Sequence, residues 1–331
     1  VKDKNGIIYA GGEFTAAGGQ VVNYVARWDG TSWSALGTGM NAAVNALALD
    51  AAGNLYAGGG FLSAEGKAGT RGIARWNGTS WSSLGGGVVG NVSDLVFDGN
   101  GNLYAGGGFS PASSGSPFTY LAMWNGTAWS GLGAPNSAVN TLAFRNGTLY
   151  AGGSFTTING TAMSGIAAWN GVAWAPLGSG TSANVSDIVF DSSGTLYAGG
   201  TFTVQGGVVA NRIARWDGNA WYALGQGMNT YVTALAMDGS GNLYAGGIFA
   251  TAGGVNANRI ARWNGSNWAA LGTGLNGSAN ALLVDSTGKV YVGGTFGTAG
   301  GVAANYIARW NGTSWEAAGS GINNNVTALA M

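Results

Sequence analysis

Two aspartates in this chain could do acid–base chemistry. Asp94 and Asp187 occupy the same place in two similar segments, the third residue of a short and largely apolar run, where the equivalent segments carry Ala or Thr. Two carboxylates that face each other can hold a cation or divide the roles of general acid and general base, provided that their geometry is matched. Hydrolysis of glycosidic bonds normally requires such a pair.

A second group of residues could recognise a ligand without transforming it. Tyr and Arg combine flat contact area with directional hydrogen bonds, which suits them to sugars or peptides. Five of them occupy one equivalent place in a repeating pattern, with Gly in the two other copies, and a sixth lies in a nearby loop. These candidate binding residues are Tyr24, Tyr120, Arg212, Arg259, Tyr306 and Tyr231. The alternative is that each side chain only packs over a neighbouring loop.

The composition excludes several other kinds of chemistry. The 331 residues include no cysteine and no histidine. Disulfides, thiolate nucleophiles, zinc sites built on Cys or His, and Ser-His-Asp triads are therefore ruled out. Aspartates open one turn in five copies of the repeat, at Asp50, Asp98, Asp191, Asp238 and Asp285. Each turn supplies one carboxylate, which is too few for a calcium site. We expect no cofactor and no metal.

Charge and hydropathy narrow the range of partners. Charged residues make up 8% of the chain and the formal net charge is zero, so no basic face for nucleic acid is visible. No apolar run reaches the roughly 18 residues that span a bilayer. The chain opens with Val1-Lys2-Asp3-Lys4, which does not resemble a signal peptide, and we expect no targeting segment in these residues. The balanced charge and the lack of an obvious apolar patch predict a monomer.

The elements that must position these residues come from an internal repeat. The residues YAGG or YVGG, with Phe two positions further on, occur seven times, and a pair of tryptophans follows each copy. The first tryptophans of successive pairs lie 48, 48, 45, 47, 47 and 47 residues apart. A period in the forties with strand-like content is typical of a propeller or a solenoid.

One unit of the repeat predicts four short strands, which we label a to d. Strand a is Val232–Met237, and a turn rich in Asp and Gly leads to strand b at Leu243–Phe249. A polar loop of about ten residues precedes strand c at Ile260–Trp263. An Asn-Gly hairpin signal then leads to strand d at Trp268–Leu271. Seven such units predict an all-β, seven-bladed β-propeller with four antiparallel strands per blade.

The two ends of the chain predict how the ring closes. The chain starts with strand b, Ile7 to Phe14, and stops after strand a, Val326 to Met331. One blade would therefore join strand a from the C-terminus to strands b–d from the N-terminus. We expect residues 1–331 to form a single propeller domain. Its repeats have strand b starting near residues 7, 55, 103, 149, 196, 243 and 290.

The repeat motif also resembles known families. The run Gly199-Gly200-Thr201-Phe202-Thr203 through Asn211-Arg212-Ile213-Ala214-Arg215-Trp216 is similar to the kelch repeat, and more so to the delta-type repeats of bacterial secreted and surface propellers. The resemblance covers the whole chain. It implies a propeller that binds partners, located outside a bacterial cell or on its surface.

The predicted topology places the candidate residues on two parts of the ring. Strand a lines the central channel of a propeller, which puts Asp94 and Asp187 near the axis. They belong to blades that are not adjacent, which weakens direct pairing, so a hydrated polar channel is the simpler interpretation. The b–c and d–a loops share one face, and the six Tyr and Arg candidates would surround its rim.

Three hypotheses about function follow. The leading one is a non-enzymatic binding or scaffold propeller that recognises an unknown glycan or protein ligand through the b–c and d–a loops, because loops on a rigid scaffold often carry function. The second is a glycan-active hydrolase or lyase that uses the carboxylates near the channel. The third is a recently amplified or engineered repeat protein without a ligand.

Overall fold

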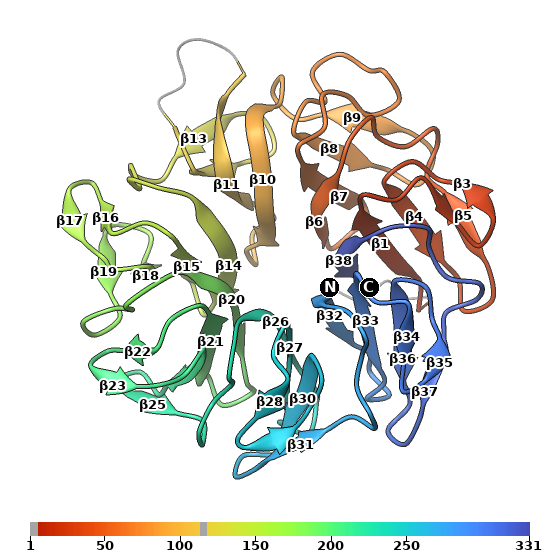
Figure 1. Cartoon of the computed structure of the whole chain (residues 1–331). Helices are drawn as coiled ribbons and strands as arrows, with labels where there is room; N and C mark the ends of the chain where they lie inside the picture. The colour runs from red at the N-terminus through yellow and green to blue at the C-terminus, as the bar shows by residue number, and fades with distance from the viewer. Residues whose placement is uncertain (1–5, 113–117) are drawn as a thin grey trace.

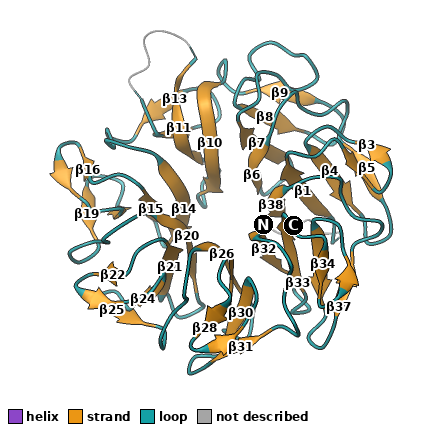
Figure 2. Ribbon diagram, viewed as in Figure 1, coloured by secondary structure: helices purple, strands orange, loops and turns teal. Residues whose placement is uncertain are grey.

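The chain forms a ring of seven small sheets around a central channel (Figure 1). The computed structural model describes residues 6–112 and 118–331, and every regular element within them is a strand (Figure 2). Each of the seven sheets has four antiparallel strands in the order a-b-c-d. The predicted seven-bladed β-propeller is confirmed. The described residues contain no helix that could cross a membrane.

We number the blades 1 to 7 along the chain and give the strand bounds by type. Strands a, from blade 1 to blade 7, are β38 (Val326–Ala330), β6 (Val44–Leu49), β10 (Val88–Phe97), β14 (Val139–Arg145), β20 (Val185–Phe190), β26 (Val232–Met237) and β32 (Ala279–Val284). Strands b are β1 (Ile8–Gly12), β7 (Leu55–Gly59), β11 (Leu103–Pro111), β15 (Thr148–Gly153), β21 (Leu196–Gly200), β27 (Leu243–Gly247) and β33 (Val290–Gly294).

The two outer strands of each blade carry the tryptophans. Strands c are β4 (Val25–Trp28), β8 (Ile73–Trp76), β12 (Leu121–Trp124), β18 (Ile166–Trp169), β24 (Ile213–Trp216), β30 (Ile260–Trp263) and β36 (Ile307–Trp310). Strands d are β5 (Trp33–Ala35), β9 (Trp81–Ser83), β13 (Trp129–Gly131), β19 (Trp174–Pro176), β25 (Trp221–Ala223), β31 (Trp268–Ala270) and β37 (Trp315–Ala317).

The b–c loops contain structure that the sequence pattern did not predict. In five blades this polar loop folds back as a two-stranded ribbon with two residues on each side. The ribbons are β2 (Ala16–Ala17) with β3 (Gln20–Val21), β16 (Thr157–Ile158) with β17 (Thr161–Ala162), β22 (Val204–Gln205) with β23 (Val208–Val209), β28 (Thr251–Ala252) with β29 (Val255–Asn256), and β34 (Thr298–Ala299) with β35 (Val302–Ala303).

The ring closes by strand pairing between the two ends of the chain. β38 pairs antiparallel with β1, with Tyr9 opposite Ala330 and Gly11 opposite Ala328. The first and last strands of the chain, β1 and β38, lie side by side in the same blade (Figure 1). The predicted closure by strand a from the C-terminus is therefore confirmed.

The glycine pair at the end of strand b permits strand a to approach closely. A Cβ on Gly247 would lie 2.1 Å from the carbonyl oxygen of Tyr231, and one on Gly246 would lie 2.9 Å from the Cβ of Ala279 in the next blade. Neither distance is tolerated by a side chain, so the pair brings two backbones and two blades together.

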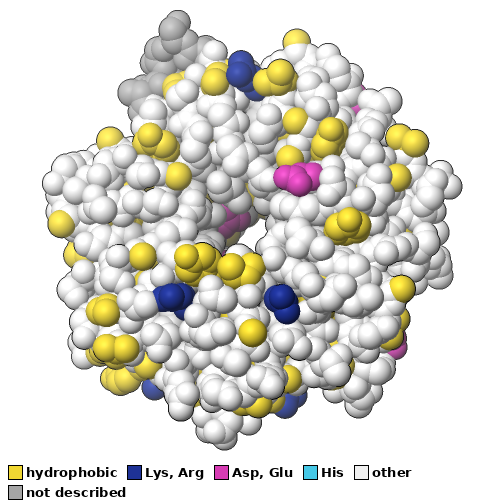
Figure 3. Space-filling model, viewed as in Figure 1, with side chains coloured by type: hydrophobic (Ala, Val, Ile, Leu, Met, Phe, Trp, Pro, Cys, Tyr) yellow, Lys and Arg dark blue, Asp and Glu magenta, His cyan; other side chains and the backbone are white. Residues whose placement is uncertain are grey.

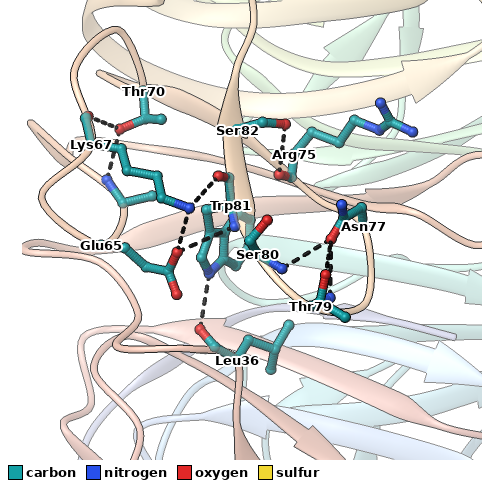
Figure 4. A network of polar contacts seen from close by, with 11 residues as sticks. Leu36, Glu65, Lys67, Thr70, Arg75, Asn77, Thr79, Ser80, Trp81 and Ser82 are labelled. Carbon is teal, nitrogen blue, oxygen red and sulfur yellow. Dashed lines mark hydrogen bonds and ion pairs between the residues drawn. The ribbon is translucent and has the colours of Figure 1, made fainter.

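The tryptophans link each blade to the one before it. The indole nitrogen of the second tryptophan of each pair donates to a backbone carbonyl of the preceding blade, over 2.6 to 3.1 Å. Figure 4 shows one example, in which Trp81 donates to the carbonyl oxygen of Leu36 at 2.9 Å. In the same view the Lys67 ammonium lies 2.8 Å from Glu65 and donates to the carbonyl oxygen of Trp81. The tryptophans thus have a structural role.

The hydrophobic core is divided among the interfaces between blades. One buried cluster, for example, combines Tyr197 and Ile213 of blade 5 with Leu243 and Phe249 of blade 6. Strands covered by a neighbouring blade on both sides are apolar without strict alternation, and the strand sequence YAGG is buried throughout in most blades. The stacked blades form a rigid scaffold for the loops and the channel.

Candidate functional site

The inner strands of the blades surround a polar chamber in the channel. Its volume is about 190 Å³, and Asp94 from β10 and Asp187 from β20 line it. Every strand a has a bulge at one residue that has no partner in the register with strand b, and that residue is polar in all seven blades. These chamber residues are Asn45, Ser93, Asn140, Ser186, Thr233, Asn280 and Thr327. The opposite mouth of the channel is lined by apolar side chains such as Leu49, Phe97 and Met331.

Each aspartate bonds the exposed edges of two inner strands. Strand a is the edge strand of its blade, so some of its N–H groups face the channel without a ladder partner. Asp94 accepts from the N–H groups of Leu95 at 2.7 Å and Leu142 at 2.6 Å. Asp187 does the same in blades 5 and 6, where its Oδ2 accepts from the N–H of Leu235 at 2.6 Å. Both carboxylates therefore have a structural use as edge caps.

The two aspartates belong to blades 3 and 5, and blade 4 separates them. Within the described residues no hydrogen bond joins them directly. Thr141 of blade 4 lies between them and donates from its hydroxyl to Asp187 at 3.3 Å. The chamber thus brings the carboxylates near each other without forming a directly bonded pair.

Desolvation inside the channel shifts both aspartates toward the protonated state. Burial raises the pKa of Asp94 from 3.8 to about 6, against the lowering effect of the N–H groups that it accepts. Burial also raises the pKa of Asp187 to about 7, and the charge of Asp94 adds to the rise. Part of each side chain still contacts the channel. The described residues contain no group of three His, Cys, Asp or Glu side chains that could hold a metal ion.

The candidate binding residues share an unusual backbone conformation. The position just before strand c, which we call the rim position, has a positive φ in all seven blades. Its non-glycine residues have φ values of 71° at Tyr24, 65° at Tyr120, 69° at Arg212, 65° at Arg259 and 66° at Tyr306. Blades 2 and 4 have Gly72 and Gly165 there, at 70° and 78°. The left-handed conformation suits glycine and costs other residues about 1–2 kcal/mol. The sequence could not reveal this strain.

Three of the rim side chains also contribute to packing. Tyr24, Tyr120 and Tyr306 are half-buried, and each packs against the hydrophobic cluster at the interface with the next blade. Each of these tyrosines thus contributes in part to the packing between two blades.

The two rim arginines lie in the adjacent blades 5 and 6 and differ in their contacts. Arg212 donates from Nη1 to the carbonyl oxygen of Phe202 at 3.2 Å, and its guanidinium carbon lies 5.7 Å from the ring centroid of Tyr231. Tyr231 is 45% exposed. The side chain of Arg259 has no hydrogen bond or ion pair with any part of the chain that the structure describes. The structure thus brings Arg212 and Tyr231 together.

A surface cavity lies beside Arg212. It has a volume of about 310 Å³, and polar side chains form most of its wall. Among its lining residues are Asn211, Arg212, Gln226, Asn229 and Thr251. Sequence reasoning missed Gln226 as a site residue, although a signal existed, because the equivalent loop position holds Thr, Ser, Gly or Ala in the other repeats. Figure 3 shows one face of the ring, with acidic side-chain atoms inside the central opening and both basic and acidic side chains on the surface around it.

Comparisons with known proteins identify the fold without a function. A family described as a domain of unknown function (DUF5122) beta-propeller matches residues 192–218 and 286–312. No curated protein matches the chain.

Solved structures with the same fold differ widely in context. The extracellular domain of a B. thetaiotaomicron protein is 13% identical with a TM-score of 0.56, and the match covers 86% of this chain and 35% of that one. This chain therefore spans about a third of the length of that relative. A computationally designed protein is 18% identical with a TM-score of 0.52, covering 89% of this chain and 92% of the other. A chain of the mitotic checkpoint complex is 15% identical with a TM-score of 0.53, covering 86% and 79%.

Proposed function

We propose that this chain is a non-enzymatic binding module that recognises a saccharide through the face carrying the b–c and d–a loops. One observation carries the proposal. Five of the seven rim positions hold Tyr or Arg in a left-handed conformation that glycine adopts without strain, and blades 2 and 4 show that glycine fits there. Strained backbone conformations cluster at functional sites.

The arrangement of the rim residues supports a shared surface. Four consecutive blades, from blade 5 round to blade 1, carry planar side chains at the rim position, namely Arg212, Arg259, Tyr306 and Tyr24. The partly exposed tyrosine rings and guanidinium groups offer flat contact area and hydrogen-bond donors, as saccharide recognition requires. Loops on a rigid scaffold are also where binding residues concentrate.

A bacterial secreted or cell-surface location forms part of this proposal. The resemblance to the repeats of bacterial secreted propellers supports it, and so does the similarity in fold to an extracellular domain from B. thetaiotaomicron. The absence of cysteine is compatible with such a location.

The test is a glycan-array assay on the intact chain beside a triple variant, Tyr24→Ala, Arg259→Ala and Tyr306→Ala. Val172→Ala is the control, since Val172 is 84% exposed in the c–d hairpin of blade 4, away from the rim. We expect binding by the intact chain and the control, and loss of binding in a folded triple variant. A chain that binds no glycan would refute the proposal and leave a repeat scaffold without a saccharide ligand.

A second candidate function is hydrolysis of glycosidic bonds by Asp94 and Asp187. The observation in its favour is that both carboxyls have a raised pKa, about 6 and about 7, which keeps a proton available near neutral pH. The chamber of about 190 Å³ is smaller than the roughly 300–1,000 Å³ of ordinary ligand pockets, and backbone N–H groups already use both carboxylates. Activity on a polysaccharide panel that is lost on Asp94→Asn and Asp187→Asn would establish it.

A further inference from the structure

Three departures from the repeat meet at the boundary between blades 5 and 6. Gln226 stands where other repeats have Thr, Ser, Gly or Ala, and Tyr231 stands where they have Ala, Asn or Ser. Arg212 is one of two arginines at a position that holds Tyr or Gly in the other blades. Seven copies of one unit need only the shared residues to fold, so departures that gather in one place are the residues that the fold leaves free for function.

The guanidinium of Arg212 is held in a fixed orientation. Its Nη1 donates to the carbonyl oxygen of Phe202, and the aromatic face of Tyr231 lies 5.7 Å from its central carbon. A guanidinium that is already oriented loses little entropy when it binds a carboxylate with two parallel hydrogen bonds. Neither Arg212 nor Arg259 has an ion pair within the described residues, so both positive charges are uncompensated.

The wall of the adjoining cavity is suited to hydroxyl groups. Asn229 uses its amide oxygen to accept from the N–H groups of Ala250 and Thr251, which leaves its amide nitrogen for a ligand. The Gln226 side chain is exposed and has no hydrogen bond within the described residues. The lining contains no acidic side chain, and its one large apolar residue, Met228, is 3% exposed.

We propose that Arg212, Gln226 and Tyr231 form a binding site for an acidic saccharide, in which Arg212 binds the carboxylate of a uronate residue. This inference rests on the proposed saccharide-binding function and names its ligand class. The positive charge of Arg212, which has no ion pair within the described residues, accounts for the negative charge of the ligand, and the amides of Gln226 and Asn229 account for its hydroxyls. A peptide site would require buried apolar or aromatic anchor pockets, and this cavity offers none.

The test measures binding of an oligogalacturonate and of its methyl ester by titration calorimetry. The ester keeps the hydroxyls and removes the charge. We expect the intact chain to bind the acid at least about tenfold more tightly than the ester, because charge-assisted bidentate bonds are the stronger kind. Arg212→Gly should abolish that difference. Glycine suits the rim conformation and occurs there in blades 2 and 4, so this variant should fold.

Two further variants separate the site from general electrostatics. Arg27→Gln removes an exposed arginine from β4 of blade 1 and should leave binding unchanged, although it alters the net charge by the same amount. Gln226→Thr copies the residue that follows strand d in blades 1 and 6, and it should weaken binding of both the acid and the ester.

Each outcome decides a separate question. Equal binding of acid and ester, or equal loss in Arg27→Gln and Arg212→Gly, would overturn the uronate site. Binding of neutral glycans on the array, lost in the triple rim variant, without any binding of the uronate, would overturn this inference and leave the proposed function standing. An aspartate-rich peptide that binds in an Arg212-dependent manner, in place of the uronate, would refute the assignment to a saccharide.

Discussion

The strain at the rim predicts that replacing Arg259 with glycine makes the protein more stable. Arg259 has a φ of 65°, and its side chain has no hydrogen bond or ion pair within the described residues. Its conformation costs an L-residue about 1–2 kcal/mol. The additional freedom of glycine in the unfolded chain offsets roughly 0.5–1 kcal/mol of that gain. Arg259→Gly should therefore raise the free energy of unfolding by about 0.5–1 kcal/mol.

Two companion variants isolate the cause. Arg259→Ala removes the rest of the side chain but keeps the Cβ that causes the strain, so it should not raise the free energy of unfolding. Tyr306→Gly relieves the same strain at a φ of 66° but removes a ring that packs on the cluster between blades 7 and 1. Loss of a fully buried aromatic side chain costs about 3–5 kcal/mol, and this ring is half-buried. The lost packing should therefore outweigh the relief of strain, so Tyr306→Gly should lower the free energy of unfolding.

The assay is chemical denaturation followed by tryptophan fluorescence, with thermal unfolding as a second measurement. For 331 residues at about 2.1 cal/mol/K each, a gain of 0.5–1 kcal/mol shifts the melting temperature by only about 1 °C, so the denaturant midpoint is the better readout. If Arg259→Ala proved as stable as Arg259→Gly, the backbone at the rim would not be strained, and the main support for a binding face would be lost.

Two other predictions concern buried polar groups. The folded pKa values of Asp94 and Asp187, about 6 and about 7, lie above the ordinary value of 3.8, so the fold binds more protons than the unfolded chain and its stability should fall as pH rises from about 4 to 7. Denaturant midpoints across this pH range measure the fall in stability. The double variant Asp94→Ala, Asp187→Ala, which copies the residue of four other blades, should make stability nearly independent of pH in this range. If the pH dependence of this variant were unchanged, the two aspartates would not be its cause. Gln205 is wholly buried, and both of its amide atoms lack a hydrogen-bond partner among the residues that the structure describes. Four other repeats have Ala at this position, so Gln205→Met should raise the free energy of unfolding by about 1–3 kcal/mol. A lower denaturant midpoint in Gln205→Met would show that the amide has a partner, such as a buried water.

The sequence by itself determined the architecture, because the features that build a blade are local and are repeated seven times. The glycine pair of strand b, the tryptophan pair and the Asn-Gly hairpin signal each predicted an element at the correct place. The split of one unit between Ile7–Phe14 and Val326–Met331 was enough to predict the closed ring.

Only the tertiary structure decided which departures from the repeat belong together. The contacts that matter join neighbouring blades, as between Asp94 and Leu142 or between Arg212 and Tyr231, and their partners depend on how the blades stack. The sequence placed Tyr24 and Arg259 on the rim but could not show their left-handed backbone, because φ is set by the closure of the loop around each residue. The residues that the repeats share predict the fold, whereas the candidate site consists of residues that differ between repeats and that only the stacking of the blades brings together.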